Sequence, residues 1–141
     1  MKVKKLLEIK TNYSFEAPVL YARSPHDRTT LKEAGALPSL DLNNFLAPEP
    51  NNIYLVRVNG ESMIDEGIFS GDILIIDKKE QPRDGKVVIA ALNGEMAVKT
   101  FKEIEGKVYL FSANKNFLPI EIQDYMQFEV QGVVKHVIHS V

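Results

Sequence analysis

Residues 86–101 read KVVIAALNGEMAVKTF and decide the fold. The dipeptide Asn93-Gly94 separates two apolar runs, 86–92 and 95–101, and this pattern is the strongest short hairpin signal in the chain. Further short strands are expected at 53–58, 73–77, 107–112, 120–122 and 128–138. Regularly spaced short strands with turns between them predict a mostly-β fold, a partly closed sheet with only short helical pieces.

The first third of the chain has a different composition. Five of the seven prolines fall in residues 1–50, and the stretch 24–30 is polar and typical of an exposed loop. Apolar residues are scattered there, and no helix-turn-helix pattern is present. We therefore predict a flexible N-terminal arm and linker at residues 1–50, which docks on another surface, and a folded domain at residues 51–141.

Composition excludes several classes of protein. The chain has 141 residues, no cysteine and a formal net charge of −2. It is long enough for one domain, has no thiolate zinc site, and lacks the basic excess usual in a freestanding DNA-binding protein. The apolar run at the N-terminus is interrupted at Glu8 and Lys10, so it does not resemble a signal peptide, and no run reaches membrane-spanning length. We expect a cytoplasmic protein without a membrane anchor.

The stretch 58–65, VNGESMID, contains the first candidate catalytic residue. It follows a predicted strand, and Gly60 allows the backbone to turn sharply. Ser62 then lies at the junction of strand and turn, where a serine serves either as a nucleophile or as the N-cap of a short helix. The motif alone favours the cap, because a second glycine at position 64, which the hydrolase elbow requires, is absent.

Lys99 is the second candidate. Period two along its strand places Lys99 on one face with Ala97 and Phe101, so the side chain is expected to be partly buried. Burial disfavours the ammonium form and lowers the pKa, which makes a lysine a general base near neutral pH. The alternative is an edge-strand lysine that reaches water and discourages strand pairing.

A Ser-Lys pair needs only a hydroxyl and an unprotonated amine within hydrogen-bond reach, without a histidine or a carboxylate. The histidines give no better site, since His136 and His139 are three apart on a strand and point to opposite faces. His26 lies in the polar loop. We therefore expect no metal and no cofactor.

Taken together, these segments resemble the LexA/UmuD family of self-cleaving serine peptidases. The similarity rests on residues 58–65, on GIFSGDILIID at 67–77, on Ala97-Val98-Lys99 and on the closing segment 128–138. The separation of Ser62 from Lys99 is the one usual in the family. The resemblance covers roughly the last ninety residues and implies a LexA/signal-peptidase-like catalytic β domain that forms homodimers.

The resemblance also implies residue roles. Ser62 would be the nucleophile, Lys99 the general base, and the backbone N–H groups of Glu61 and Ser62 the oxyanion hole. The substrate would be the chain's own arm, cut at Ala34-Gly35, the only Ala-Gly dipeptide in the sequence. The alternative for this dipeptide is a helix C-cap at Gly35.

Within the family, the layout resembles UmuD more than the LexA and phage repressors, which carry a DNA-binding domain before the cut. The expected partners are then a RecA–single-stranded-DNA filament, which stimulates cleavage, and a Y-family (UmuC-like) translesion polymerase, without direct sequence-specific binding to DNA. Two alternatives remain: a LexA-like or phage-repressor-like regulator that lacks a DNA-binding domain, and a non-catalytic dimeric binding module in which Ser62 and Lys99 are silent.

Overall fold

The structure is a computed structural model, and it describes residues 1–7, 16–18 and 39–141. The chain divides into two compact units. One unit consists of Met1–Ile9 and Glu49–Val141, and the other of Lys10–Pro48. Both candidate catalytic side chains, Ser62 and Lys99, belong to the first unit.

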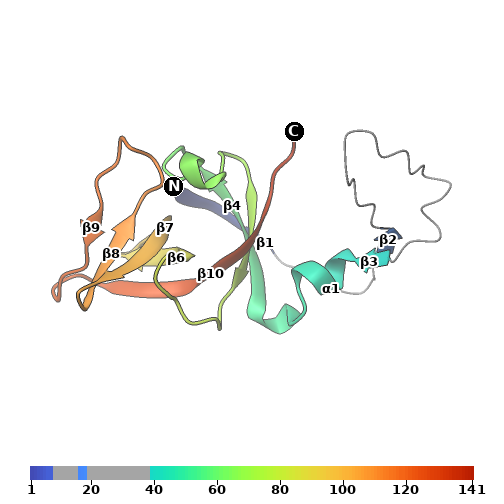
Figure 1. Cartoon of the computed structure of the whole chain (residues 1–141), viewed down its shortest axis with the longest axis horizontal. Helices are drawn as coiled ribbons and strands as arrows, with labels where there is room; N and C mark the ends of the chain where they lie inside the picture. The colour runs from blue at the N-terminus through green and yellow to red at the C-terminus, as the bar shows by residue number, and fades with distance from the viewer. Residues whose placement is uncertain (8–15, 19–38) are drawn as a thin grey trace. The chain divides into compact units, whose positions relative to one another are not determined.

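The first unit is built on one antiparallel sheet with the strand order β1-β4-β5-β10-β6-β7-β8-β9 (Figure 1). The strands are β1 (Lys2–Leu7), β4 (Ile53–Asn59), β5 (Ile73–Asp77), β6 (Val87–Leu92), β7 (Glu95–Ile104), β8 (Lys107–Phe111), β9 (Ile120–Glu121) and β10 (Phe128–Ile138). Because β1 also pairs with β7, the strands from β1 to β7 in this order close into a barrel. The predicted mostly-β class is confirmed.

Strand β1 is the element that the sequence analysis grouped differently. The predicted boundary at residue 50 assigns it to the arm, whereas in the structure it pairs with β4 and β7 of the first unit. The sequence of β1 gives only a weak strand signal, because Val3 is the one strong β-former among its lysine-rich residues 2–5. The strand forms because it pairs with β4 and β7, and its own residues have little preference for β structure.

The hairpin of β6 and β7 forms as its sequence predicts. Asn93 and Gly94 have φ values of 50° and 83°, the left-handed conformation that a two-residue hairpin turn requires. The register pairs Val88 with Lys99 and Ala90 with Ala97. This register fixes Lys99 in the middle of the sheet rather than at a frayed end.

Strand β10 bends across the barrel and pairs with β6 through its first half and with β5 through its second half. The register shifts between Val130 and Gly132, which marks a β-bulge. A Cβ atom added at Gly132 would lie 2.4 Å from Ile76 Cγ2 and 2.9 Å from the Asp77 carbonyl oxygen. The bend therefore depends on a close approach of backbone that only glycine permits.

Two apolar clusters form the interior. The first joins β4, β5, β6 and β7 to the turn after β4, through Met1, Val56, Val58, Met63, Ile68, Leu74, Ile76, Ile89 and Val98. The second consists of Val88, Ala90, Phe101, Leu110 and Val133. Met63 is fully buried, and burial of such a side chain contributes about 1.5–3 kcal/mol. The residue next to Ser62 thus anchors the turn in the core.

The second unit contains a short antiparallel pair, β2 (Glu16–Pro18) with β3 (Ser39–Asp41), followed by α1 (Leu42–Leu46). Asp41 caps this helix, since its side chain accepts hydrogen bonds from the backbone N–H groups of Asn43 and Asn44. In the first unit, the described residues also form two 3₁₀ turns, η2 (Pro50–Asn52) and η3 (Ile64–Glu66). No helix in the described ranges is both long enough and apolar enough to cross a membrane.

Candidate active site at the end of β4

Ser62 lies in the turn that follows β4. Gly60 has a φ of +108°, which ends the strand sharply, and Ser62 is only 2% exposed. The predicted capping role is wrong: η3 is capped by Met63, without any side-chain hydrogen bond. The reason is that the 3₁₀ turn begins one residue later than expected, so the Ser62 hydroxyl is directed to another partner.

That partner is the N-terminus of β1. The α-amino group of Met1 donates a hydrogen bond to Ser62 Oγ. Burial, followed by the charges of Lys99 and Lys2, lowers the pKa of the Met1 amino group to about 6. The Met1 amine thus contacts the Ser62 hydroxyl and lies close enough to Lys99 to experience its charge.

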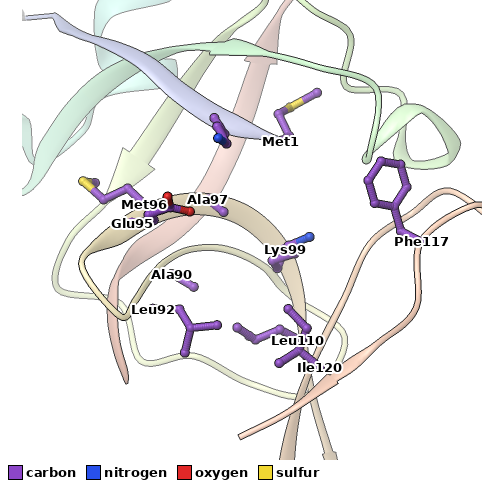
Figure 2. Close-up of a pocket in the computed structure, with 11 residues that line it drawn as sticks. Met1, Ala90, Leu92, Glu95, Met96, Ala97, Lys99, Leu110, Phe117 and Ile120 are labelled. Atoms are coloured by element: carbon purple, nitrogen blue, oxygen red, sulfur yellow. The ribbon is translucent and has the colours of Figure 1, made fainter. Parts of the chain in front are cut away.

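Lys99 extends from β7 into a cavity of about 280 Å³. Figure 2 shows its ammonium directed to the space between Met1 and Phe117, with Leu92, Leu110 and Ile120 on the other side. Desolvation in this apolar surrounding lowers the pKa of Lys99 below its usual 10.5. The predicted partial burial and the predicted direction of the pKa shift are both confirmed.

The hydrogen-bond partner of Lys99 is a hydroxyl that the sequence analysis did not single out. Lys99 Nζ donates to Ser112 Oγ over 2.7 Å, just after β8, and lies 5.9 Å from the centre of the Phe117 ring. Among the hydrogen bonds of the described residues there is none between Lys99 and Ser62 directly. Ser62 and Lys99 are thus held by different neighbours, the Met1 amine and the Ser112 hydroxyl, and Met1 also lines the cavity around Lys99.

The segment after β8 also braces the turn that carries Ser62. Asn114, only 8% exposed, donates from Nδ2 to the Glu61 carbonyl oxygen over 2.9 Å. The Asp65 N–H donates to the Ala113 carbonyl oxygen over 2.8 Å, and the Ala113 N–H lies 3.4 Å from Met63 Sδ. The only sequence signal for this brace is a polar Ser-Ala-Asn triplet, 112–114, directly after an apolar strand.

The backbone groups of Glu61 and Ser62 lie in this turn. The Glu61 carbonyl oxygen is occupied by Asn114, and more weakly by the Ile64 N–H at 3.3 Å. Within the described part of the chain, neither the Glu61 N–H nor the Ser62 N–H donates a hydrogen bond to another residue.

Other predicted residues lie away from this site. His139 Nδ1 pairs with Asp72 Oδ1 at 2.6 Å, and Asp72 Oδ2 accepts from the Phe69 N–H at 2.8 Å. This contact ties the chain's last residues to the loop before β5. No cluster of three metal-ligating side chains occurs among the residues that were searched, which are the described ones. Ala34, Gly35 and His26 fall outside the described residues.

Comparison with known proteins places the chain in a family. The sequence profile of the Peptidase S24-like family matches residues 25–135, more than half of the chain. The LexA repressor of Xylella fastidiosa (strain M23) is 36% identical over 89 residues, which is 63% of this chain and 41% of the relative. LexA repressor 2 of Pseudomonas putida (strain KT2440) is 36% identical over 101 residues, 68% of this chain and 50% of the relative.

A third relative, the LexA repressor of Colwellia psychrerythraea (strain 34H), is 39% identical over 88 residues, 62% of this chain and 42% of the relative. The chain thus spans about two fifths to one half of the length of these curated relatives. The resemblance to the LexA/UmuD family is confirmed, and the β domain has the fold expected from it. The chain belongs to the Peptidase S24-like family.

Proposed function

We propose that this chain is a self-cleaving serine peptidase in which Ser62 is the nucleophile and Lys99 the general base. The observation that carries the proposal is geometric: Met1, whose amino group donates to Ser62 Oγ, also lines the cavity that holds Lys99. Lys99 itself has a pKa lowered by burial. A two-residue acyl-transfer site requires a serine hydroxyl and a lysine that loses its proton easily, and Ser62 and Lys99 would supply these two groups.

The chemistry follows from these groups. Neutral Lys99 takes the proton of Ser62, and the Ser62 oxygen attacks the carbonyl carbon of Ala34. The oxyanion that forms is stabilised by the N–H groups of Glu61 and Ser62. Collapse of the tetrahedral intermediate breaks the bond to the Gly35 nitrogen, which receives the proton from Lys99. Water activated by the same lysine then hydrolyses the Ser62 ester and restores both side chains.

The proposed scissile bond is Ala34-Gly35. A small alanine fits a narrow site, and glycine permits the backbone kink that a self-docked segment needs. Because nucleophile and substrate belong to one chain, the effective concentration of the scissile bond is high, and an imperfectly deprotonated lysine suffices. Cleavage would give a shortened chain that begins at Gly35.

In the cell, we propose a UmuD-like role in the SOS response to DNA damage. A RecA–single-stranded-DNA filament would favour the conformation in which the arm is cut, a shift of population. The shortened homodimer would then join a Y-family translesion polymerase.

A repressor-like regulator is the second candidate, favoured by the names of the relatives, which are LexA repressors. The two roles differ in the partner of the cleaved protein. Purified protein would be incubated with RecA, ATP and single-stranded DNA, then mixed with a Y-family polymerase and separated by size. Co-elution of the cleaved form, but not of uncut Ser62→Ala protein, is expected for the UmuD-like role. Cleavage without polymerase binding would favour the regulator.

A further inference from the structure

Strand β1 fills the gap that would otherwise separate β4 from β7. It pairs with β4 at five positions, from Lys2 opposite Asn59 to Leu7 opposite Leu55. On its other side Lys2 lies opposite Ala97, and the Val98 N–H donates to the Met1 carbonyl oxygen over 2.7 Å. Among the described residues, β1 therefore lies between β4, which precedes Ser62, and β7, which carries Lys99.

The same strand covers the nucleophile. Met1 is 7% exposed and contacts Ser62 through its amino group. A Cβ atom built at Gly60 would lie 3.7 Å from Met1 Cα, so the end of β1 passes directly over the turn. Met1, labelled in Figure 2, also lines the cavity that holds Lys99, and so does Lys2.

A peptide that is to be cut must place a carbonyl carbon against Ser62 Oγ. The adjacent strand edges, the end of β4 and the middle of β7, offer backbone groups that bind an extended peptide by strand addition. In this structure β1 already uses those groups and already contacts the hydroxyl. The slot has room for one strand, since neighbouring strands are spaced at about 4.8 Å.

We propose that the slot between β4 and β7 is a binding site for one extended peptide strand, and that β1 is its resident, autoinhibitory occupant. The segment to be cut takes the place of β1 before Ser62 reacts. This inference rests on the proposed peptidase function, because it names the event that must precede cleavage. Cleavage then requires two conformational steps: departure of β1 and entry of the scissile segment.

Strand β1 is paired more extensively with β4 than with β7. Five register pairs join it to β4, but only one joins it to β7. Separation from β7 therefore breaks few hydrogen bonds, and β1 leaves the slot completely only when its pairs with β4 also break.

A disulfide lock tests the proposal, since the chain has no cysteine of its own. Lys2 and Asn59 are exposed register partners on β1 and β4, and paired residues of antiparallel strands have the Cα separation that a disulfide spans. Self-cleavage of the double variant Lys2→Cys/Asn59→Cys would be measured at alkaline pH in its oxidised form and in its reduced form. We expect loss of self-cleavage in the oxidised form and its return on reduction.

A matched control uses Ile104→Cys/Lys107→Cys, exposed partners at the β7–β8 turn. This lock should leave the cleavage rate unchanged. A second variant, Val3→Ala, removes part of the apolar contact of β1 with the first core cluster and should increase the rate by roughly five-fold.

The outcomes separate this inference from the function on which it rests. If the oxidised Lys2→Cys/Asn59→Cys protein cuts itself as fast as its reduced form, β1 need not leave and the inference is wrong, although the peptidase function stands. A folded Val3→Ala protein that cuts at the parent rate or more slowly also contradicts it. Absence of cleavage in the parent chain as well would remove the peptidase function itself.

Discussion

Lys99 Nζ donates a hydrogen bond to Ser112 Oγ over 2.7 Å, and this contact holds the ammonium at the edge of the cavity that Met1 closes. The Ser62 hydroxyl is held separately, by the Met1 amino group. Lys99 is thus oriented by a hydroxyl other than that of the proposed nucleophile. We therefore expect Ser112 to act as a positioning residue for Lys99.

The first prediction concerns Ser112. Ser112→Ala removes a charge-assisted hydrogen bond, and a loss of about 1.5 kcal/mol in positioning would slow self-cleavage roughly ten-fold. Ser112→Thr keeps the hydroxyl and should restore most of the rate. The measurement is the rate of fragment formation across pH. A purely structural role would lower the rate equally for Thr and Ala and would leave the pH profile unmoved.

The second prediction is the pH dependence of the reaction. Because burial lowers the pKa of Lys99 below its usual 10.5, the neutral base is present at lower pH than for an exposed lysine. The rate of self-cleavage should rise ten-fold per pH unit and level off below pH 10.5. Stability should change in the same direction, since the buried ammonium penalises the folded state below the folded pKa, and this penalty disappears as pH rises to 10.5.

Lys99→Arg serves as the control for this profile, because arginine retains the charge and does not lose its proton in this range. We expect the rate to fall by about 10² to 10⁴, the usual contribution of a general base, and the pH dependence of Lys99 to disappear. A profile that is the same in the parent and in Lys99→Arg would show that another group is the base.

The third prediction tests the brace behind the nucleophile. Asn114→Ala removes the bond to the Glu61 carbonyl oxygen and the bond from the Asn116 N–H to Asn114 Oδ1 at 3.0 Å. The Glu61 carbonyl oxygen would keep only the longer bond from the Ile64 N–H, and the loss of a net hydrogen-bond contribution of about 0.5–1.5 kcal/mol should lower both stability and cleavage rate. Urea unfolding and fragment formation measure the two effects. An unchanged rate in a folded Asn114→Ala protein would mean that the turn holds its geometry without this side chain.

The fourth prediction concerns the bend of β10. Gly132→Ala would place a methyl group 2.4 Å from Ile76 Cγ2 and should destabilise the fold by about 1–3 kcal/mol. The matched control is Gly106→Ala, where a Cβ would contact nothing within 4 Å and only the left-handed φ of +78° opposes the change. Urea unfolding at neutral pH compares the two, and an equal cost in both would contradict the proposed clash.

Much of the barrel was predictable because its strands are local and strongly patterned. The strands at 73–77 and 128–138 have the predicted bounds, and the Asn93-Gly94 turn required no tertiary information. Ser62 and Lys99 were proposed as catalytic residues from their chemistry and from the resemblance to a family. In the structure Ser62 is buried, and Lys99 is partly buried and lines the cavity.

What escaped prediction depends on long-range contacts. The paired positions of β1 and β4 lie 48 to 57 residues apart in the chain, and the lysines of β1 give little local signal for the pairing that closes the barrel. Ser112 and Asn114 reach Lys99 and Glu61 only after β7 and β8 have folded back on each other. The capping role assigned to Ser62 failed because a shift of one residue in a short 3₁₀ turn redirects its hydroxyl.

The most direct test of the central claim is the intact mass of the purified protein after incubation at about pH 10, where even an ordinary lysine is substantially deprotonated. Ser62→Ala protein would be treated in parallel. The account predicts a fragment that begins at Gly35 in the parent protein and none in the variant. An unchanged mass in the parent, both alone and with RecA, ATP and single-stranded DNA, or an equal cut in Ser62→Ala, would contradict it.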